Sequence, residues 1–497
     1  MSPTGADRGI AWRLFLTVWL VYSVFATTNV VRETYLAISL GTRATVRVDE
    51  YLGLHPDLFE IPGRGGFINS NPGASIVGAL PYAVLVRPAI TLAVRLKPEI
   101  AQPKPPATYD DPRPNRTKFM NAARERGLDI VLGLAALGTA VTVMAPLGAL
   151  AALLMFLFLR ERLDGRGRAL AWSLVFAFAT PMLFRSAFLN QNAIVAHLVL
   201  AAWILKVGLT PGQQAAIPAV TTLASIGMLL GFAIVCDYSG IPLAVVFGVW
   251  ILSDGWNRGG VAGAMREGAI YSIGAVASLS VLLAYQWVAF GHPIWPAQRY
   301  MPPTEFSVRG WFGFTLPSLD LLWRNLFDLR YGLFAFCPLL IAALAAPFAK
   351  PRGWSLSRRE VGWIYFAFVA LLLFSSANQF ANLQWNTGVR YMVPVVPLLF
   401  IAAIPTLEAM PRAGRWSLVA LSMVITLAVS MTREDVPTAL RMLASEGPTL
   451  PVLIVLRKMS SGYDVNLPPA TFGLIAFLIT VILVLVWRPV WRRARQA

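Results

Sequence analysis

The sequence predicts an all-α polytopic membrane protein of about twelve transmembrane helices. Three observations lead to this fold class. Of the 497 residues, 57% are hydrophobic and only 13% are charged, the mean hydropathy is +0.61, and apolar residues form stretches long enough to cross about 30 Å of hydrocarbon. Water-soluble globular proteins do not have this composition, so lipid is the expected solvent for most of the chain.

The expected spans follow one another with short connections, and no long soluble segment lies between them. We therefore expect residues 1–497 to form a single transmembrane domain without an appended soluble domain. The spans are expected near residues 12–31, 128–159, 168–186, 191–208, 216–235, 238–253, 268–290, 332–349, 361–376, 391–407, 415–431 and 470–487.

The net charge of +17 reports on topology. Arginines gather in alternate short connections, such as 160–168, 258–266 and 350–359, which the positive-inside rule places in the cytoplasm. No basic face of the kind that binds nucleic acid is indicated. Both termini are therefore expected to be cytoplasmic.

The first outer loop, residues 32–127, is the longest connection in this topology. Its apolar segment 72–97 is interrupted by Pro72, Pro81, Arg87 and Pro88. Counting this segment as a span would put the basic 160–168 connection outside. We therefore expect segment 72–97 to lie in, or dip into, the outer membrane interface as interfacial helices.

Acidic residues of the outer side are candidates for chemistry. Asp49 and Glu50 follow the first expected span, and paired carboxylates beside a bilayer can act as general base and orienting group, or bind a divalent cation. A solvated loop pair is the alternative. Asp237 and Tyr238 interrupt an apolar stretch, where an ionisable residue suggests a binding site or a helix cap. Asn71 opens a Pro-Gly turn.

Arginines and aromatic residues also gather on the outer side. They can stack on a sugar and bind a lipid phosphate, or they can form an aromatic belt with snorkelling arginines. The candidates are His292, Arg299, Trp385, Arg390 and Tyr391. Only three histidines and two separated cysteines occur, so a zinc site is not indicated.

The order of these short motifs resembles the integral-membrane glycosyltransferases of the C-type fold, especially relatives of protein O-mannosyltransferases and of the lipid A aminoarabinose transferase. The resemblance covers most of the chain, although the large outer domain of the O-mannosyltransferases is missing. It rests on Val48-Asp49-Glu50, Asn71-Pro-Gly-Ala-Ser75, Cys236-Asp-Tyr-Ser-Gly240, Phe290-Gly-His-Pro293 and Trp385-Asn-Thr-Gly-Val-Arg-Tyr391.

The resemblance implies an inverting glycosyltransferase that moves a sugar from a polyprenyl-phosphate donor to a lipid, glycan or protein acceptor on the extracytoplasmic face. Asp49 would be the base, with Glu50 beside it. Arg390 and Arg299 would bind the donor phosphate, and the other candidates would contact substrate. A divalent metal is the one cofactor that the acidic pair suggests.

Two other functions fit the composition. A secondary transporter or lipid flippase also has many helices, although such proteins usually place ionisable groups near the midplane and have repeated halves. A non-catalytic membrane scaffold of the same fold is the second alternative, because a fold alone does not determine a function.

Overall fold

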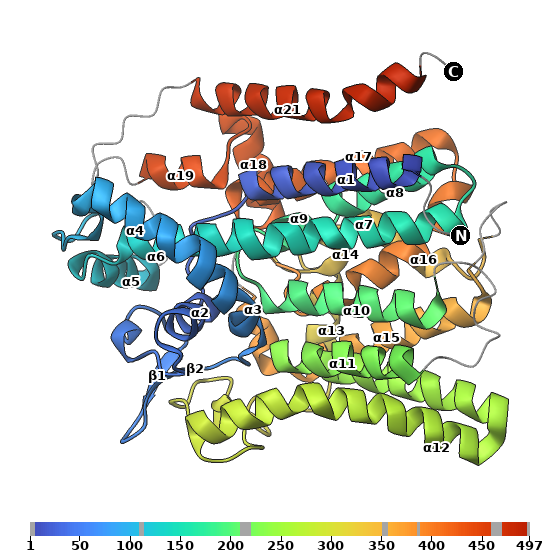
Figure 1. Ribbon diagram of the computed structural model, residues 1–497, viewed down its shortest axis with the longest axis horizontal. Coiled ribbons are helices and arrows are strands. Elements are labelled where there is room, and N and C mark those ends of the chain that lie inside the picture. Colours follow the sequence, from blue (N-terminus) through green and yellow to red (C-terminus); the bar gives the residue numbers. More distant parts are fainter. Residues whose placement is uncertain are drawn as a thin grey trace.

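The structure is a computed structural model that describes residues 5–108, 114–208, 220–349, 356–384, 388–458 and 470–494. Regular structure in these ranges is almost entirely helical, and its sheet has two strands. The expected all-α class is confirmed. Figure 1 shows a bundle of long helices with a smaller cap of short elements at one end.

The bundle helices run roughly parallel to one another along the long axis of the molecule (Figure 1). Their shared core is apolar and reaches from α1 to α19. The bundle comprises α1 (Gly5–Val24), α7 (Ala145–Arg162), α8 (Arg166–Phe178), α9 (Met182–Arg185), α10 (Gln191–Val207), α11 (Val220–Cys236), α12 (Gly240–Phe290), α13 (Leu319–Phe327), α14 (Leu333–Phe336), α15 (Arg358–Ala377), α16 (Val396–Ala409), α17 (Arg412–Thr432) and α21 (Thr471–Ala494).

The cap is built mostly from the first outer loop and has an apolar core of its own. Strand β1 (Leu58–Ile61) pairs antiparallel with β2 (Gly65–Ile68), so that Leu58 faces Ile68. The other cap elements are α2 (Arg32–Arg43), α3 (Gly73–Pro81), α4 (Arg87–Leu96), α5 (Pro114–Glu125), α6 (Asp129–Thr139) and the 3₁₀ turns Asp49–Tyr51, Pro98–Ala101 and Ala297–Arg299. Helices α18 (Val436–Glu446) and α19 (Pro451–Lys458) belong to the bundle, because their buried residues are part of its core.

Six helices in the described ranges are long and apolar enough to cross a membrane, or seven if the bent pair α18 and α19 counts as one span. Three shorter apolar helices, among them α10 and α11, have 10–17 residues. These helices agree with a membrane protein. The expected number of about twelve spans stays a prediction. The six are Gly73–Leu96, Asp129–Arg162, Gly240–Phe290, Arg358–Ala377, Arg412–Thr432 and Thr471–Arg488.

Two of these long helices contain a π-helical turn just before a proline. Tyr82–Val86 joins α3 to α4, and Ala140–Met144 joins α6 to α7. In each turn a backbone N–H reaches the carbonyl five residues earlier, and Pro88 or Pro146 follows as the second residue of the next helix. A proline has no N–H and its ring clashes with the preceding turn. The π turn widens the helix there, and the helix continues past the proline.

Helix α12 is a hairpin of two helical arms. Gly259 and Gly260 have non-helical dihedral angles, and Gly260 has a φ of 59° that favours glycine. The arms lie side by side, since the Tyr271 hydroxyl donates to the carbonyl of Ala244 at 2.7 Å. These arms correspond to the spans expected near 238–253 and 268–290.

The expected span 332–349 is not a regular α-helix. It consists of α14 followed by a 3₁₀ helix over Pro338–Ala345, with the break at Cys337. Side chains of neighbouring helices satisfy its backbone: Ser422 Oγ accepts the N–H of Leu339 at 2.9 Å, and the Tyr365 hydroxyl donates to Ala343 at 2.6 Å. Irregular backbone at membrane depth requires such protein partners.

The segment expected at the interface, 72–97, forms the continuous helix Gly73–Leu96. It runs obliquely to the bundle helices in Figure 1, and only 17% of its most apolar window is buried. Its length and composition would also allow a span. The expected interfacial position therefore stays a prediction.

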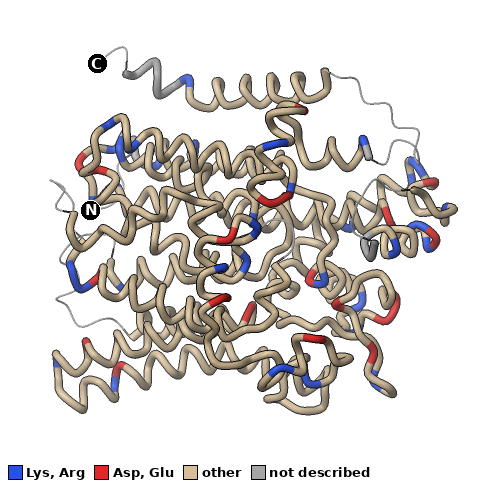
Figure 2. Tube along the Cα trace, turned by 180° about the vertical axis from the view of Figure 1, so that it is seen from behind, with Lys and Arg blue, Asp and Glu red and all other residues tan. Residues whose placement is uncertain are grey.

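The cap lies at one end of the bundle, whereas α1 begins, α21 ends and the α7–α8 connection turns at the other end (Figure 1). Most charged residues lie toward the two ends, with a smaller group near the centre (Figure 2). The basic connection 160–168 thus lies far from the first outer loop, as the expected topology requires.

Cysteine labelling in intact cells tests which end faces outward. Glu60, in the β-hairpin, and Asp164, between α7 and α8, are exposed, while both native cysteines are buried. We expect a membrane-impermeant maleimide to label Glu60→Cys in intact cells and Asp164→Cys only after permeabilisation. Labelling of Asp164→Cys in intact cells would show that the orientation is the reverse of the one expected.

Candidate functional site

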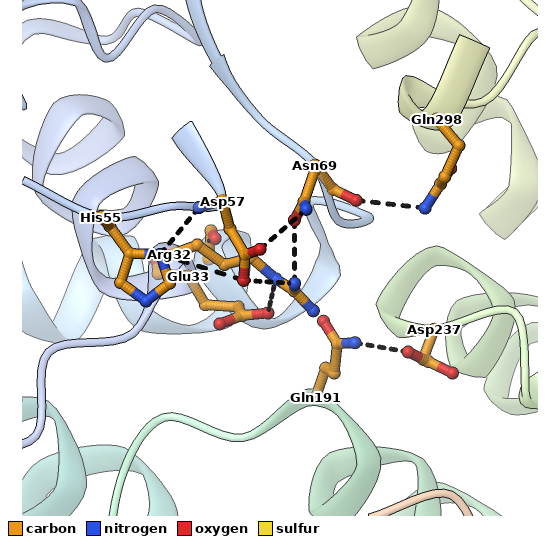
Figure 3. Close-up of polar contacts among 9 residues, drawn as sticks. Arg32, Glu33, His55, Asp57, Asn69, Gln191, Asp237 and Gln298 are labelled. Carbon is orange, nitrogen blue, oxygen red and sulfur yellow. Dashed lines mark hydrogen bonds and ion pairs between the residues drawn. The ribbon is translucent and has the colours of Figure 1, made fainter. Parts of the chain in front are cut away.

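A cavity of about 1790 Å³ lies where the cap meets the bundle. Its polar part is formed by residues that come from seven separate places in the chain, and Figure 3 shows how most of them converge. The polar lining includes Arg32, His55, Asp57, Asn69, Asn71, Gln191, Asp237, Tyr238, Gln298 and Arg390.

Arg32 lies at the centre of the polar contacts (Figure 3). Its Nη1 atom donates to Asp57 Oδ2 and to Asn69 Oδ1, both at 2.8 Å, and its Nε atom donates to Glu33 Oε1 at 2.9 Å. The Arg32 side chain is only 11% exposed. A charge buried this deeply needs paired and hydrogen-bonded partners, and the two carboxylates supply them.

The β-hairpin brings Asp57 and Asn69 to Arg32. Asp57 directly precedes β1 and Asn69 directly follows β2, so strand pairing places the two residues opposite each other. The Asn69 side-chain N–H donates to Asp57 Oδ1 at 2.9 Å, and Gln298 donates to the Asn69 carbonyl at 3.2 Å. Arg32 is the first residue of α2. One short hairpin thus fixes the geometry of three polar side chains.

The charges around Asp57 keep it ionised. Burial by itself would raise the pKa of the Asp57 carboxyl, but the positive charge of Arg32, aided by His55 and Arg390, outweighs burial and holds this pKa below its ordinary value. For Arg32, burial would lower the pKa, and the charges of Glu33 and Asp57 raise it instead. The pair is therefore a carboxylate with a guanidinium at neutral pH.

A hydrogen bond to the backbone fixes the tautomer of the neutral His55 ring, so that its Nε2–H can act as a donor. Its Nδ1 atom accepts the backbone N–H of Asp57 at 3.1 Å, which leaves the proton of the neutral ring on Nε2. Burial lowers the pKa of His55, with Asp57 opposing and Arg32 reinforcing the shift. His292 repeats the arrangement, because its Nδ1 accepts the N–H of Ile294 at 3.2 Å. Both histidines precede a proline.

Asp237 is the second carboxylate of the cavity, and its partners are neutral. It follows the last residue of α11, and its Oδ1 atom accepts the backbone N–H of Ser239 at 2.8 Å. Its Oδ2 atom accepts from the side-chain amide of Gln191 (Figure 3). No arginine or lysine among the described residues forms an ion pair with Asp237. Each of its oxygens keeps a lone pair for another donor.

Arg390 brings an unpaired guanidinium to the cavity. It stacks on Tyr391, with Cζ 5.2 Å from the ring centre, and within the described part of the chain its guanidinium has no hydrogen bond or ion pair. Its charge is close enough to Asp57 to lower the pKa of that carboxyl. A cation that lines a cavity without a protein anion is suited to an anionic ligand.

Gln384 fixes the backbone that carries Arg390. Its Oε1 atom accepts the N–H of Arg390 at 2.8 Å and that of Tyr391 at 3.4 Å. Its amide nitrogen donates to Asn325 and to the carbonyl of Ala381. The side chain is buried, at 5% exposure, so protein groups must supply all of these hydrogen bonds.

The rest of the cavity is apolar, and its two apolar walls differ. Helices α6 and α19 supply an aliphatic wall, whereas the segment after α12 and the end of α15 supply an aromatic one. The aliphatic wall includes Ile130, Leu132, Leu134, Leu137, Val452, Val455 and Leu456, and the aromatic wall includes Trp311, Phe312, Phe314, Phe374 and Phe380.

The chain has no match in the comparisons. Family models, curated proteins and solved structures were searched, and none matches it. The geometry of the cavity therefore carries the functional argument.

Five of the candidate residues chosen from the sequence line this cavity: Asn71, Asp237, Tyr238, Arg390 and Tyr391. They come from three separate segments, so the tertiary structure brings them together. Asn71 donates to the carbonyl of Ile234 at 2.8 Å, which ties the first outer loop to the end of α11. Tyr238 accepts from Gln286 at 3.0 Å.

Asp49 and Glu50 are not among the residues that line the cavity. Asp49 forms an ion pair with Arg47 at 2.9 Å and accepts the N–H of Gly66. Glu50 forms an ion pair with Arg43 at 2.8 Å. Each acidic side chain is almost half exposed. These contacts stabilise the cap and do not bring the acidic pair to Arg390.

Arg299 and His292 also lie outside the cavity lining. The Arg299 guanidinium stacks on Trp295, at 4.6 Å from the ring centre, and the His292 ring lies 5.6 Å from that of Trp295. The two candidates therefore share Trp295 as an aromatic contact. Trp385 lies outside the described residues.

The sequence reasoning missed the centre of the site, although weak signals were present. Arg32 and Glu33 stand where the first apolar helix gives way to the loop, and Asn190, Gln191 and Asn192 open the apolar helix α10. Polar residues at such boundaries can be ordinary helix caps, as Asn190 is. In the described ranges, no three His, Cys, Asp or Glu side chains gather closely enough to hold a metal ion.

Replacing Gln384 tests its role in holding Arg390. We expect Gln384→Leu to destabilise the protein by about 2 kcal/mol, because buried backbone N–H groups lose their acceptor. Gln384→Glu keeps the acceptor oxygens, but it loses the amide donors and introduces a buried charge, so it should be destabilised as well. Thermal unfolding in detergent measures both variants, and a wild-type melting temperature for Gln384→Leu would contradict this role.

Proposed function

We propose that this chain is an inverting glycosyltransferase that moves a sugar from a polyprenyl-phosphate donor to an acceptor on the extracytoplasmic face of a bacterial plasma membrane. The observation that carries the proposal is the Arg390 guanidinium, which has no ion pair among the described residues and lines a cavity with an open carboxylate, Asp237, and an aliphatic wall. These three features match a donor that has a phosphate, a reacting sugar and a hydrocarbon chain.

The phosphate is assigned to Arg390. A guanidinium presents its N–H groups as a fork that matches two phosphate oxygens. Arg32 also lines the cavity, but Glu33 and Asp57 already balance its charge. Positive charge at the phosphate stabilises the negative charge that develops there as the bond to the sugar breaks.

The general base is assigned to Asp237. A base needs an accessible lone pair and a basicity that a neighbouring cation does not reduce. Asp57 fails the second condition, because Arg32 lowers its pKa, whereas the partners of Asp237 are an amide and a backbone N–H. Asp57 then acts as the group that holds Arg32 and Asn69 in place.

The reaction needs one displacement. Asp237 takes the proton of an acceptor hydroxyl, and the hydroxyl oxygen bonds to the anomeric carbon of the donor sugar. The bond from that carbon to the phosphate oxygen breaks at the same time, and the polyprenyl phosphate leaves with both electrons. A single displacement at carbon inverts the anomeric configuration.

The prenyl chain is assigned to the aliphatic wall of α6 and α19. Val452, Val455 and Leu456 of α19 face the cavity together with Leu134 and Leu137 of α6. Burial of hydrocarbon contributes about 0.8 kcal/mol per CH₂ group, so a long prenyl chain gains affinity without any polar contact.

Replacing each carboxylate separately tests the base. With an undecaprenyl-phosphate hexose as donor, we expect Asp237→Asn to lower kcat by about 10²- to 10⁴-fold, because the acceptor proton loses its base. Asp49→Asn serves as the control and should keep near wild-type turnover, since Asp49 lies outside the cavity. Loss of turnover in Asp49→Asn, with activity retained in Asp237→Asn, would move the base to Asp49.

Replacing Arg390 tests the phosphate contact. We expect Arg390→Ala to weaken binding of farnesyl phosphate about ten- to hundredfold, since a charge-assisted hydrogen bond to the phosphate is lost. Arg390→Lys should restore only part of the affinity, because a point charge replaces a fork. Isothermal titration calorimetry with the purified protein gives these affinities.

Two controls separate the phosphate contact from general packing. Farnesol, which lacks the phosphate, should bind the wild type and Arg390→Ala equally. Arg299→Ala removes an arginine that also stacks on an aromatic ring but lies outside the cavity, and should leave farnesyl phosphate affinity unchanged. Wild-type affinity in Arg390→Ala would rule out the proposed phosphate site and, with it, the donor assignment.

A further inference from the structure

The turn Gly310–Phe314 is the most strained segment that lines the cavity. Three of its residues have a positive φ: Gly310 at 59°, Phe312 at 50° and Gly313 at 90°. Glycine adopts this conformation readily, but phenylalanine does not. Strained residues of this kind persist where the surrounding structure holds them, and they are concentrated at functional sites.

Hydrogen bonds and close packing hold the turn. Trp311 and Phe314 exchange backbone hydrogen bonds at 2.8 and 3.0 Å. The N–H of Gln379 donates to the Gly313 carbonyl at 2.8 Å. A Cβ atom on Gly310 would lie 2.0 Å from the Phe314 carbonyl oxygen, so only glycine fits there. The turn is thereby fixed to the segment that follows α15.

This rigid turn presents aromatic faces to the cavity. The rings of Trp311 and Phe312 lie 5.2 Å apart, and both line the cavity together with Phe314. Trp311 is 61% exposed, so its ring is not used to fill the protein core. An exposed ring on a fixed backbone can stack on a ligand with little loss of conformational freedom.

Amide groups that line the same cavity have unused hydrogen-bonding capacity. Asn378 lines the cavity, and its Oδ1 atom accepts the N–H of Phe380. Gln298 lines it too, and its Nε2 atom donates to the Asn69 carbonyl (Figure 3). Among the described residues nothing bonds to the amide NH₂ of Asn378 or to the Oε1 atom of Gln298. The wall thus offers both donors and an acceptor.

Aromatic rings together with free amides suit a different ligand from the one that the aliphatic wall suits. A prenyl chain has no group that could use the free amides of Asn378 and Gln298. A sugar ring has apolar C–H faces that stack on aromatic rings and hydroxyl groups that bond to amides. The proposed function assigns the donor phosphate to Arg390, the reacting sugar to the position beside Asp237, and the prenyl chain to α6 and α19. The aromatic wall therefore remains for the acceptor.

We propose that the turn Gly310–Phe314, with Asn378 and Gln298, binds a sugar ring of the acceptor, so that the acceptor is a carbohydrate. This inference rests on the proposed function and narrows it, because a lipid or protein acceptor without a sugar at the reacting end would not use this wall. Trp311 provides the principal stacking face.

The test measures carbohydrate binding by the full-length protein in nanodiscs. The probes are the methyl α- and β-glycosides of glucose, galactose, mannose and arabinose, observed by saturation-transfer NMR. We expect at least one glycoside to bind the wild type and Trp311→Ala to weaken it about three- to tenfold, the range for loss of one aromatic contact. Trp311→Phe should retain most of the affinity.

Trp323→Ala is the matched control. Trp323 is 62% exposed, as exposed as Trp311, but it does not line the cavity. Its replacement should leave glycoside binding unchanged. Equal effects of the two alanine variants would identify Trp311 as a residue of the membrane-interface belt and overturn the proposal, as would the absence of binding by every glycoside.

Farnesyl phosphate separates this inference from the function on which it rests. We expect Trp311→Ala to bind farnesyl phosphate with wild-type affinity. Weakened farnesyl phosphate binding with unchanged glycoside binding would assign the aromatic wall to the prenyl chain and overturn the carbohydrate site alone. Retention of farnesyl phosphate affinity by Arg390→Ala would overturn the proposed function, whatever Trp311→Ala does.

Discussion

The buried guanidinium of Arg32 is the constraint on which the site depends. A charge in this position must be paired, because an isolated buried ion is far less stable than one in water. Glu33 comes from the same helix, but Asp57 and Asn69 come from the β-hairpin. The need to pair one cation therefore fixes α2 against the hairpin. Removing Arg32 would leave the carboxylates of Glu33 and Asp57 without the cation that they share.

A second set of contacts, made by the backbone just before Arg390, positions that residue. The N–H of Val389 donates to the carbonyl of Tyr331 at 3.0 Å, within the break between α13 and α14. A Cβ atom on Gly388 would lie 2.2 Å from the Tyr331 Cα atom, so glycine is required for this approach. Val389 has a φ of 54°, a strained value for a β-branched residue. Irregular backbone thus positions the cationic group, whereas regular helices supply the walls of the cavity.

The charged residues of the site have different electrostatic surroundings. Asp57 and Arg32 form an ion pair, and Asp237 has neutral partners. Arg390 lines the cavity, and no described residue forms an ion pair with it. Groups with different electrostatic surroundings can take different parts in one reaction, as base and as phosphate ligand. The two apolar walls add a second division, because aliphatic side chains suit a hydrocarbon chain and aromatic rings with amides suit a sugar.

The sequence by itself determined the membrane class, the all-α fold and several of the cavity residues, because these depend on composition and on local signals. Long apolar stretches predict helices in lipid, and Asp237 and Arg390 stand out as charged residues at the ends of such stretches. The tertiary structure alone decided that Asp57 and Arg32 occupy the centre while Asp49 and Glu50 pair with neighbouring arginines in the cap. In the sequence, all four of these residues are charged residues of the same expected loop. Only strand pairing between β1 and β2, a long-range contact, determines which carboxylate meets the buried arginine.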